Sequence, residues 1–223
     1  MQRNENMKRV LEFITSMGEG GAQSLVKDYA LNINKNEFDT MPTMKLNELK
    51  EAERIKISLL KYIYKSTKGR YIAVPEVSLP NSIIDILVTN GDIHIYEIKS
   101  KADSLVRLEK QISDYKKFAH KVTVVADEKF ISKLDTLDFM DGVGVISVSS
   151  RYGLTHIRDS RKFEVGKNFY LAYWSPIELR ESLRDFEQWY KYSSHEAYNK
   201  ILEVLTEDEL RKVTLFRLKE KYI

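Results

Sequence analysis

Three charged side chains interrupt two apolar segments that an Asn-Gly sequence joins. Asp85 lies within residues 83–88, and Glu97 and Lys99 lie near the end of residues 93–99. A charge inside a sheet is costly unless it is paired or holds a metal. Two carboxylates beside a lysine can bind Mg²⁺ or Mn²⁺, and such a cation polarises a phosphoryl group and activates water. The residue types and their spacing therefore indicate metal-assisted phosphate chemistry.

The length of the connection decides whether these side chains can share one site. Side chains alternate along a strand, so Glu97 and Lys99 lie on the same face. A two-residue turn at Asn90-Gly91 would place Asp85 on the opposite face. A three-residue connection or a bulge places Asp85 beside Glu97 instead. We therefore predict an odd-length connection.

The elements that must position these residues follow from the apolar spacing. Two segments precede the hairpin: a helix over 47–65 and a strand over 71–77, which Pro75 makes an edge strand or a broken one. Later segments predict a helix over 105–119, a buried strand over 122–126, a short helix over 128–134, a buried strand over 143–148 and a peripheral hairpin over 154–165. Capping boxes at Ser175, Ser193 and Thr206 predict short helices in the C-terminal part. This alternation of strands and helices is typical of an α/β domain.

One further pair of residues extends the pattern on the hairpin. Gln111 and Tyr115 lie one turn apart on the predicted helix 105–119. The whole pattern resembles the PD-(D/E)XK nuclease superfamily, and it consists of Asp85, Glu97-x-Lys99 and Gln111-x-x-x-Tyr115. The last of these is similar to the Q-x-x-x-Y motif of the RecB-like members. Ile84 stands where the superfamily's name has Pro. The resemblance covers about residues 47–215.

The resemblance implies a fold and a set of site residues. The implied fold is α/β, a restriction-endonuclease-like mixed sheet flanked by helices, with a helical C-terminal extension. The implied catalytic residues are Asp85, Glu97, Lys99, Gln111 and Tyr115. The implied ligands of Mg²⁺ or Mn²⁺ are Asp85, Glu97, the carbonyl of Ile98 and the accessory acid Glu76.

The implied activity is that of a metal-dependent nuclease that hydrolyses phosphodiester bonds of DNA, in DNA repair or in defence against foreign DNA. The first alternative is a nucleic-acid-binding module that keeps the nuclease fold without turnover. The second is structural, with Glu97 in a surface salt bridge with Lys99 or Lys101 and Asp85 at a strand edge. The substrate form, endo- or exonuclease action and the oligomeric state stay open, with a homodimer as one option.

The N-terminal residues have a different character. Residues 8–39 contain a predicted strand, a glycine-rich loop at Gly18-Glu19-Gly20-Gly21 and a predicted helix. They resemble the start of GT-B glycosyltransferases, which makes a glycosyltransferase-related protein the third alternative. We predict an N-terminal appendage over 1–43, a nuclease-like core over 44–170 and a helical extension over 171–223.

Composition limits the remaining function classes. The chain has 223 residues, 36 basic and 33 acidic, so DNA binding requires basic residues that cluster locally. It has no cysteine, which excludes disulfides, thiolate catalysis and cysteine-ligated zinc. Its four histidines are scattered and lack the spacing of a zinc site. No apolar run approaches the length of a membrane span, so we expect a cytoplasmic protein.

Overall fold

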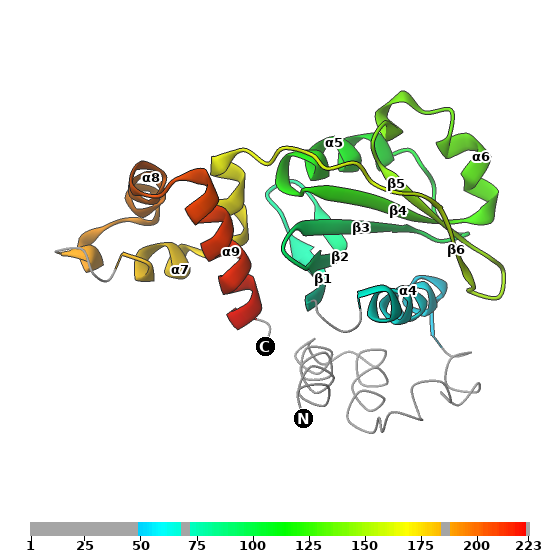
Figure 1. Cartoon of the computed structure of the whole chain (residues 1–223), viewed down its shortest axis with the longest axis horizontal. Helices are drawn as coiled ribbons and strands as arrows, with labels where there is room; N and C mark the ends of the chain where they lie inside the picture. The colour runs from blue at the N-terminus through cyan, green and yellow to red at the C-terminus, as the bar shows by residue number, and fades with distance from the viewer. Residues whose placement is uncertain (1–48, 68–71, 184–187, 222–223) are drawn as a thin grey trace, which may run out of the picture.

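The computed structural model describes residues 49–67, 72–183 and 188–221. These residues form an α/β fold in which a six-stranded mixed sheet is flanked by helices, and the helical C-terminal part lies at one end of the sheet (Figure 1). The predicted α/β class is therefore correct. The strand, loop and helix predicted within residues 8–39 lie outside the described residues, and so does the predicted segment 1–43. The domain division stays a prediction.

The core elements follow the order that the sequence predicts. The strands are β1 (Ile72–Ser78), β2 (Ile83–Thr89), β3 (Ile93–Lys99), β4 (Lys121–Asp127), β5 (Gly144–Val148) and β6 (Leu154–Arg158). The core helices are α4 (Glu51–Thr67), α5 (Leu108–Phe118) and α6 (Ile131–Leu134), with the 3₁₀ turns η1 (Glu128–Phe130) and η2 (Asp138–Met140).

The sheet order is β1-β2-β3-β4-β5-β6, with β1, β2 and β3 joined as an antiparallel meander. β4 pairs in parallel with both β3 and β5, whereas β6 pairs antiparallel with β5. β4 and β5 are interior strands covered on both faces, as their nearly continuous apolar sequences predict. Pro75 lies on β1, which is an edge strand, as predicted.

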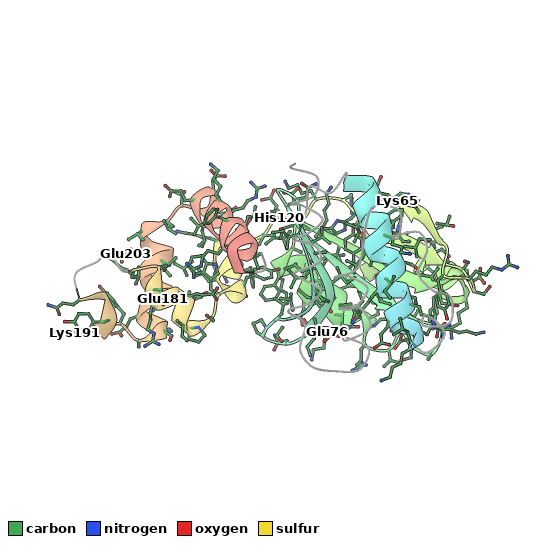
Figure 2. The ribbon with its side chains drawn as sticks, turned by 90° about the horizontal axis from the view of Figure 1, so that it is seen from below. Lys65, Glu76, His120, Glu181, Lys191 and Glu203 are labelled. Atoms are coloured by element: carbon green, nitrogen blue, oxygen red, sulfur yellow. The ribbon has the colours of Figure 1, made fainter. Side chains whose placement is uncertain are left out.

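Each face of the sheet has its own helix. The buried residues Ile55, Leu59 and Ile63 recur at helical spacing and pack α4 against one face, which α4 crosses in Figure 2. On the other face, α5 packs Leu108 and Ile112 into a second apolar cluster, together with residues of the C-terminal part. Burial of each such side chain contributes about 1.5–3 kcal/mol. The sheet is thus fixed between two helices, and the two sides of a strand face different surroundings.

The connection between β2 and β3 has three residues. Thr89 pairs with Ile93 across the hairpin, and the Asn90 amide donates to the Asp92 carbonyl at 3.1 Å. Gly91 has φ +82°, a left-handed conformation that favours glycine. The prediction of an odd-length connection is confirmed.

The predicted hairpin over 154–165 is wrong. Only β6 is a strand, and it pairs with β5 rather than with the residues that follow it. Those residues find backbone partners in the core instead: Arg161 donates its amide to the Gly142 carbonyl at 2.9 Å, and Phe163 to the His120 carbonyl at 2.7 Å. Because the amides of Arg161 and Phe163 already have these partners, they do not pair with β6 to form a second strand.

The C-terminal part consists of η3 (Lys167–Tyr173), α7 (Pro176–Glu181), η4 (Trp189–Lys191), α8 (Ser194–Val204) and α9 (Glu207–Lys221). The predicted capping boxes form at Ser175 and Ser193, and Thr206 exchanges the same pair of bonds with Glu209. This part is tied to the core, because the Tyr173 hydroxyl donates to the Phe118 carbonyl at 2.7 Å.

None of the helices in the described part of the chain combines the length and the apolar character that crossing a bilayer would require.

The turn conformation gives a direct test of the hairpin. A Cβ at Gly91 would meet nothing within 4 Å, so any cost of Gly91→Ala comes from its φ of +82°. We expect this change to lower the free energy of unfolding by about 1 kcal/mol. Gly91→Asn should lose less, because asparagine tolerates positive φ. Urea unfolding measures both, and an alanine variant as stable as the parent would contradict the turn.

Candidate functional site

The predicted site residues come from three neighbouring elements. Asp85 lies on β2, Glu97 and Lys99 lie at the carboxyl end of β3, and Gln111 and Tyr115 lie on α5. The β2–β3 register pairs Ile86 with Tyr96, and continuing it by one residue places Asp85 opposite Glu97. Glu97 has the same strand parity as the buried residues that face α5, so the site lies on the α5 side of the sheet.

Glu97 is a buried carboxylate with three side-chain donors. Its Oε1 atom accepts hydrogen bonds from Lys99 Nζ at 2.6 Å and from Gln111 Nε2 at 2.6 Å. Its Oε2 atom accepts from the Tyr115 hydroxyl at 2.8 Å. Lys99 Nζ also donates to Gln111 Oε1 at 2.9 Å. The structure therefore brings together four of the residues that the sequence selects.

Asp85 joins this cluster through the backbone. Its Oδ2 atom accepts a hydrogen bond from the Ile98 amide at 2.7 Å. The paired residues of β2 and β3 end at Ile86 and Tyr96, so the Asp85 side chain takes the place of the next backbone partner. Ile98, predicted to offer its carbonyl to a metal, here contributes its N–H group to the Asp85 carboxylate.

Glu76 lies at the margin of the site. The β1–β2 register places it opposite Asp85, but its φ is +55°. Its side chain is 60% exposed and forms an ion pair with Lys56 Nζ of α4 at 2.8 Å. A non-glycine residue at positive φ inside a strand is strained, and such strain often accompanies functional sites.

Sequence reasoning missed two charged neighbours of Asp85. The Lys56 ammonium lowers and the Asp103 carboxylate raises the pKa of Asp85. Lys56 follows Ile55 in the apolar stripe of α4, yet the sequence does not say which end of that helix faces the hairpin. Asp103 lies in the loop after β3, where its Oδ2 accepts from the Ser100 amide at 2.8 Å.

Burial and charge repulsion both raise the pKa values of the two acids. Burial raises the pKa of both Asp85 and Glu97 above the usual carboxyl range, and the charge of Asp85 raises that of Glu97 further. The Ile98 N–H lowers the pKa of Asp85, and the Lys99 ammonium opposes the rise at both acids. Burial, followed by the charge of Glu97, raises the pKa of Tyr115, which stays a proton donor. One lysine within the cluster therefore balances two carboxylates only in part.

The carboxylates of Asp85 and Glu97 are oxygen ligands of the kind that a hard divalent cation prefers, although there are only two of them. Within the described ranges, no group of three or more His, Asp or Glu side chains lies close enough together to hold a metal. Mg²⁺ is commonly held by only one or two carboxylates, with water and phosphate oxygens completing its shell. Asp85 and Glu97 match that requirement.

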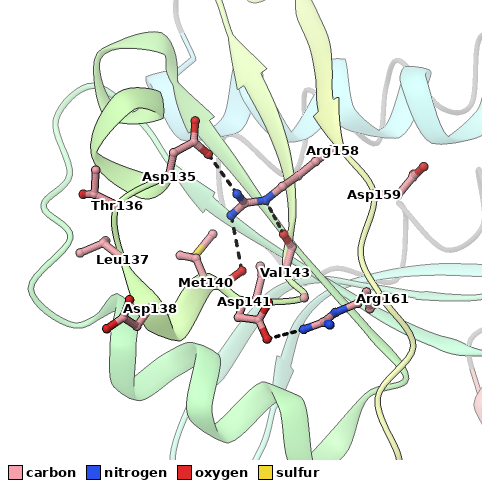
Figure 3. Close-up of a pocket in the computed structure, with 11 residues that line it drawn as sticks. Asp135, Thr136, Leu137, Asp138, Met140, Asp141, Val143, Arg158, Asp159 and Arg161 are labelled. Atoms are coloured by element: carbon pink, nitrogen blue, oxygen red, sulfur yellow. Dashed lines mark hydrogen bonds and ion pairs between the residues drawn. The ribbon is translucent and has the colours of Figure 1, made fainter.

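A separate cavity lies at the opposite end of the parallel strands, between the α6–β5 connection and the end of β6 (Figure 3). Arg158 spans it with structural bonds, from Nε to the Val143 carbonyl at 2.9 Å and from a terminal nitrogen to Asp135 at 3.0 Å. Arg161 pairs with Asp141. Its arginines are therefore held by neighbouring acids and carbonyls.

Fold and site together define an α/β protein with a buried carboxylate–lysine cluster between a strand meander and a helix. Residues 7–223 match the family described as bacteriophage P4 protein cII, and the chain belongs to that family. Protein cII of Enterobacteria phage P4 is 28% identical, over 78% of this chain and 69% of that protein. A solved protein of unknown function from Silicibacter pomeroyi is 14% identical, with a TM-score of 0.43 over 55% of this chain and 80% of that one.

The family match corrects the expected identity. Membership of the PD-(D/E)XK nucleases was wrong, because the chain belongs to the phage P4 cII family over nearly its whole length. The predicted function, a metal-dependent nuclease that hydrolyses phosphodiester bonds of DNA, was therefore wrong as well. The same holds for its alternative, a non-catalytic module on a nuclease fold. The physical reason is that the same residue types can have a structural role. They form hydrogen bonds with one another and so link β3 to α5 through a buried polar cluster, which consists of Glu97, Lys99, Gln111 and Tyr115.

The resemblance of residues 8–39 to GT-B glycosyltransferases was also wrong. The family match begins at residue 7 and runs through this segment, so these residues belong to the cII family. A glycine-rich loop between a predicted strand and a predicted helix is common to many α/β proteins, and it does not identify one of them.

The Tyr115 hydroxyl tests whether the cluster stabilises the fold. Tyr115→Phe removes a hydroxyl that lies 2.8 Å from Glu97 Oε2 and 2.9 Å from the Ile83 carbonyl and donates its one hydrogen to one of them. We expect the free energy of unfolding to fall by about 1–3 kcal/mol, because a buried acceptor loses its partner. The half-buried Tyr192 of the C-terminal part is the control, and Tyr192→Phe should cost less than about 0.5 kcal/mol. Equal losses in chemical denaturation would argue against the network.

Proposed function

We propose that the Asp85–Glu97 pair binds a divalent cation, Mg²⁺ or Mn²⁺, and that the protein uses this site to hold a phosphate group of DNA. The observation that carries the proposal is the register of the hairpin, which sets the half-buried Asp85 opposite the buried Glu97. Two carboxylates at adjacent, largely water-excluded positions repel each other unless positive charge lies between them.

The side chains divide into ligands and supports. Asp85 and Glu97 would hold the cation, and the Ile98 carbonyl and Glu76 are further candidates. Glu76 would have to leave Lys56, with which it forms an exposed ion pair. A bound cation would supply positive charge for a phosphate oxygen. Gln111 and Tyr115 fix the orientation of the Glu97 carboxylate through the bonds at 2.6 and 2.8 Å.

The surroundings of the site favour an anionic partner. Gln111 belongs to the first turn of α5, so the amino end of this helix lies beside the cluster. The N–H groups of a helix start carry partial positive charge and attract phosphate. The N-cap residue Arg107 makes no side-chain capping bond, and both it and Lys110 are exposed. DNA is the phosphate-bearing partner that we propose.

We also propose that the order α4–β1–β2–β3–α5–β4 is a restriction-endonuclease-like arrangement. Its support is a helix, an antiparallel meander, a second helix on the other face and a parallel strand beside β3. The proposal concerns the arrangement of the elements alone, and no activity follows from it.

Titration with Mn²⁺ tests the cation site. We expect the parent to bind Mn²⁺ in isothermal titration calorimetry, and Asp85→Asn and Glu97→Gln each to weaken binding by about tenfold or more. Glu109→Gln is the matched control, because it removes an exposed carboxylate from α5. Lys99→Met should bind Mn²⁺ at least as tightly as the parent, because a cation that repels the metal is removed.

The partner is tested with the same variants by fluorescence anisotropy of labelled duplex DNA. Mn²⁺ should strengthen DNA binding by the parent relative to EDTA, and Asp85→Asn should lose this difference. Lys99→Met should keep its affinity for Mn²⁺ and bind DNA more weakly. If no Mn²⁺ binds, or if the acid variants bind it like the parent, the cation site is wrong. If Mn²⁺ binds without changing DNA affinity, only the partner is wrong.

A further inference from the structure

A second polar cavity lies away from the carboxylate cluster. Its volume is about 470 Å³, and it is lined by residues of α4, β3, β4, β5 and the β6 segment. It lies at the amino end of β3, on the side of α4, whereas Glu97 and Lys99 lie at the carboxyl end on the side of α5. The volume falls within the range of about 300–1,000 Å³ that is typical of small-molecule sites.

One wall of this cavity is aromatic. His94 and Tyr96 project to the same face of β3 and stack with ring centroids 4.1 Å apart and an interplanar angle of 27°. His94 Nε2 lies 2.8 Å from the Thr123 hydroxyl, a contact that fixes the imidazole. Burial, assisted by the charge of Lys121, lowers the pKa of His94 to about 3. The ring is therefore neutral at pH 7, and the wall is suited to a planar, uncharged ring.

The cationic group of this cavity is Lys121. Among the described residues it forms no ion pair, and its charge acts on His94, which places it beside the aromatic wall. Arg158 also borders the cavity, but its guanidinium points to Asp135 and Val143 on the other side of β6 (Figure 3). Lys121 is therefore the side chain that can meet an anion.

Asp159, the carboxylate of this cavity, contacts a histidine of the same lining. His156 Nε2 lies 3.0 Å from Asp159 Oδ1, and the Asp159 side chain is 96% exposed. In Figure 3 this side chain points away from the neighbouring arginines. The rest of the lining is mostly hydroxylic, with Tyr62 and Ser66 supplied by the last turns of α4. The Ser66 hydroxyl donates to the Ile63 carbonyl at 3.0 Å and the Ser160 hydroxyl to the Arg161 carbonyl at 2.9 Å. Their oxygens can still accept hydrogen bonds, which suits a sugar or another polyhydroxyl moiety.

We propose that this cavity binds a small anionic ligand with a planar ring, of the chemical class of a nucleoside monophosphate. The ring lies against His94 and Tyr96, and the anionic group meets Lys121. The inference does not rest on the proposed cation site, because the two places share no residue.

Calorimetric titration of the full chain with adenosine monophosphate tests the inference. EDTA in the buffer removes divalent cations from the carboxylate cluster. We expect saturable binding of one equivalent, and weaker binding of adenosine and of inorganic phosphate by about tenfold or more. Lys121→Ala should weaken binding of the nucleotide by about tenfold and leave that of adenosine unchanged. Lys133→Ala, which removes an exposed lysine from α6, should behave as the parent.

A second variant tests the space itself. Ser66→Trp places a large ring at the end of α4 and should weaken the binding of both nucleotide and nucleoside, whereas Ser132→Trp, on the exposed side of α6, should not. Thermal unfolding establishes that each variant is folded, and Lys121→Gln replaces Lys121→Ala if the latter is not. Absence of saturable nucleotide binding to the parent, or binding that neither Lys121→Ala nor Ser66→Trp weakens, overturns the proposal.

Discussion

The buried carboxylate of Glu97 is the constraint on which the site depends. A carboxylate removed from water must find donors or a cation, and Glu97 has three side-chain donors from two elements. Lys99 comes from the same strand, whereas Gln111 and Tyr115 come from α5, so satisfying Glu97 fixes the helix against the sheet. The three-residue turn then brings Asp85 to the same place. Burial raises the pKa of both acids, and Lys99 opposes this rise at both of them, whereas Lys56 opposes it at Asp85 alone.

The same turn connects the site with the C-terminal part of the chain. Asp92, the last residue of the turn, forms ion pairs with Lys162 at 2.8 Å and with Arg211 of α9 at 3.1 Å. Arg211 also donates to the Gly91 carbonyl at 2.5 Å. Nearby, His120 bonds to the Ile93 amide and to the Tyr170 hydroxyl at 3.0 Å each. The turn conformation decides which face of the sheet Asp85 occupies. It is stabilised by these contacts from outside the hairpin as well as by the bond from the Asn90 amide to the Asp92 carbonyl.

Local chemistry explains what the sequence could predict. The alternation of side chains in β2 and β3, the glycine in their turn and the capping boxes each depend on residues close in the chain, and all of them are confirmed. Contacts between distant segments were not accessible in this way. The Lys56–Glu76 pair depends on the side of the sheet that α4 covers, and the bond from Ile98 to Asp85 depends on where the two strands separate. The cavity beside His94 is lined by residues of five elements that are far apart in the chain, so no local pattern indicates it.

Function was less accessible than fold, since an acid–acid–lysine pattern has more than one physical use. The same side chains can hold a cation, or they can satisfy one another as a polar link between strand and helix. Anomalous scattering from crystals grown with Mn²⁺ separates these uses most directly. The cation site predicts a manganese peak about 2.1 Å from carboxylate oxygens of both Asp85 and Glu97. A map without a peak there, with Lys99 still bonded to Glu97, would contradict it.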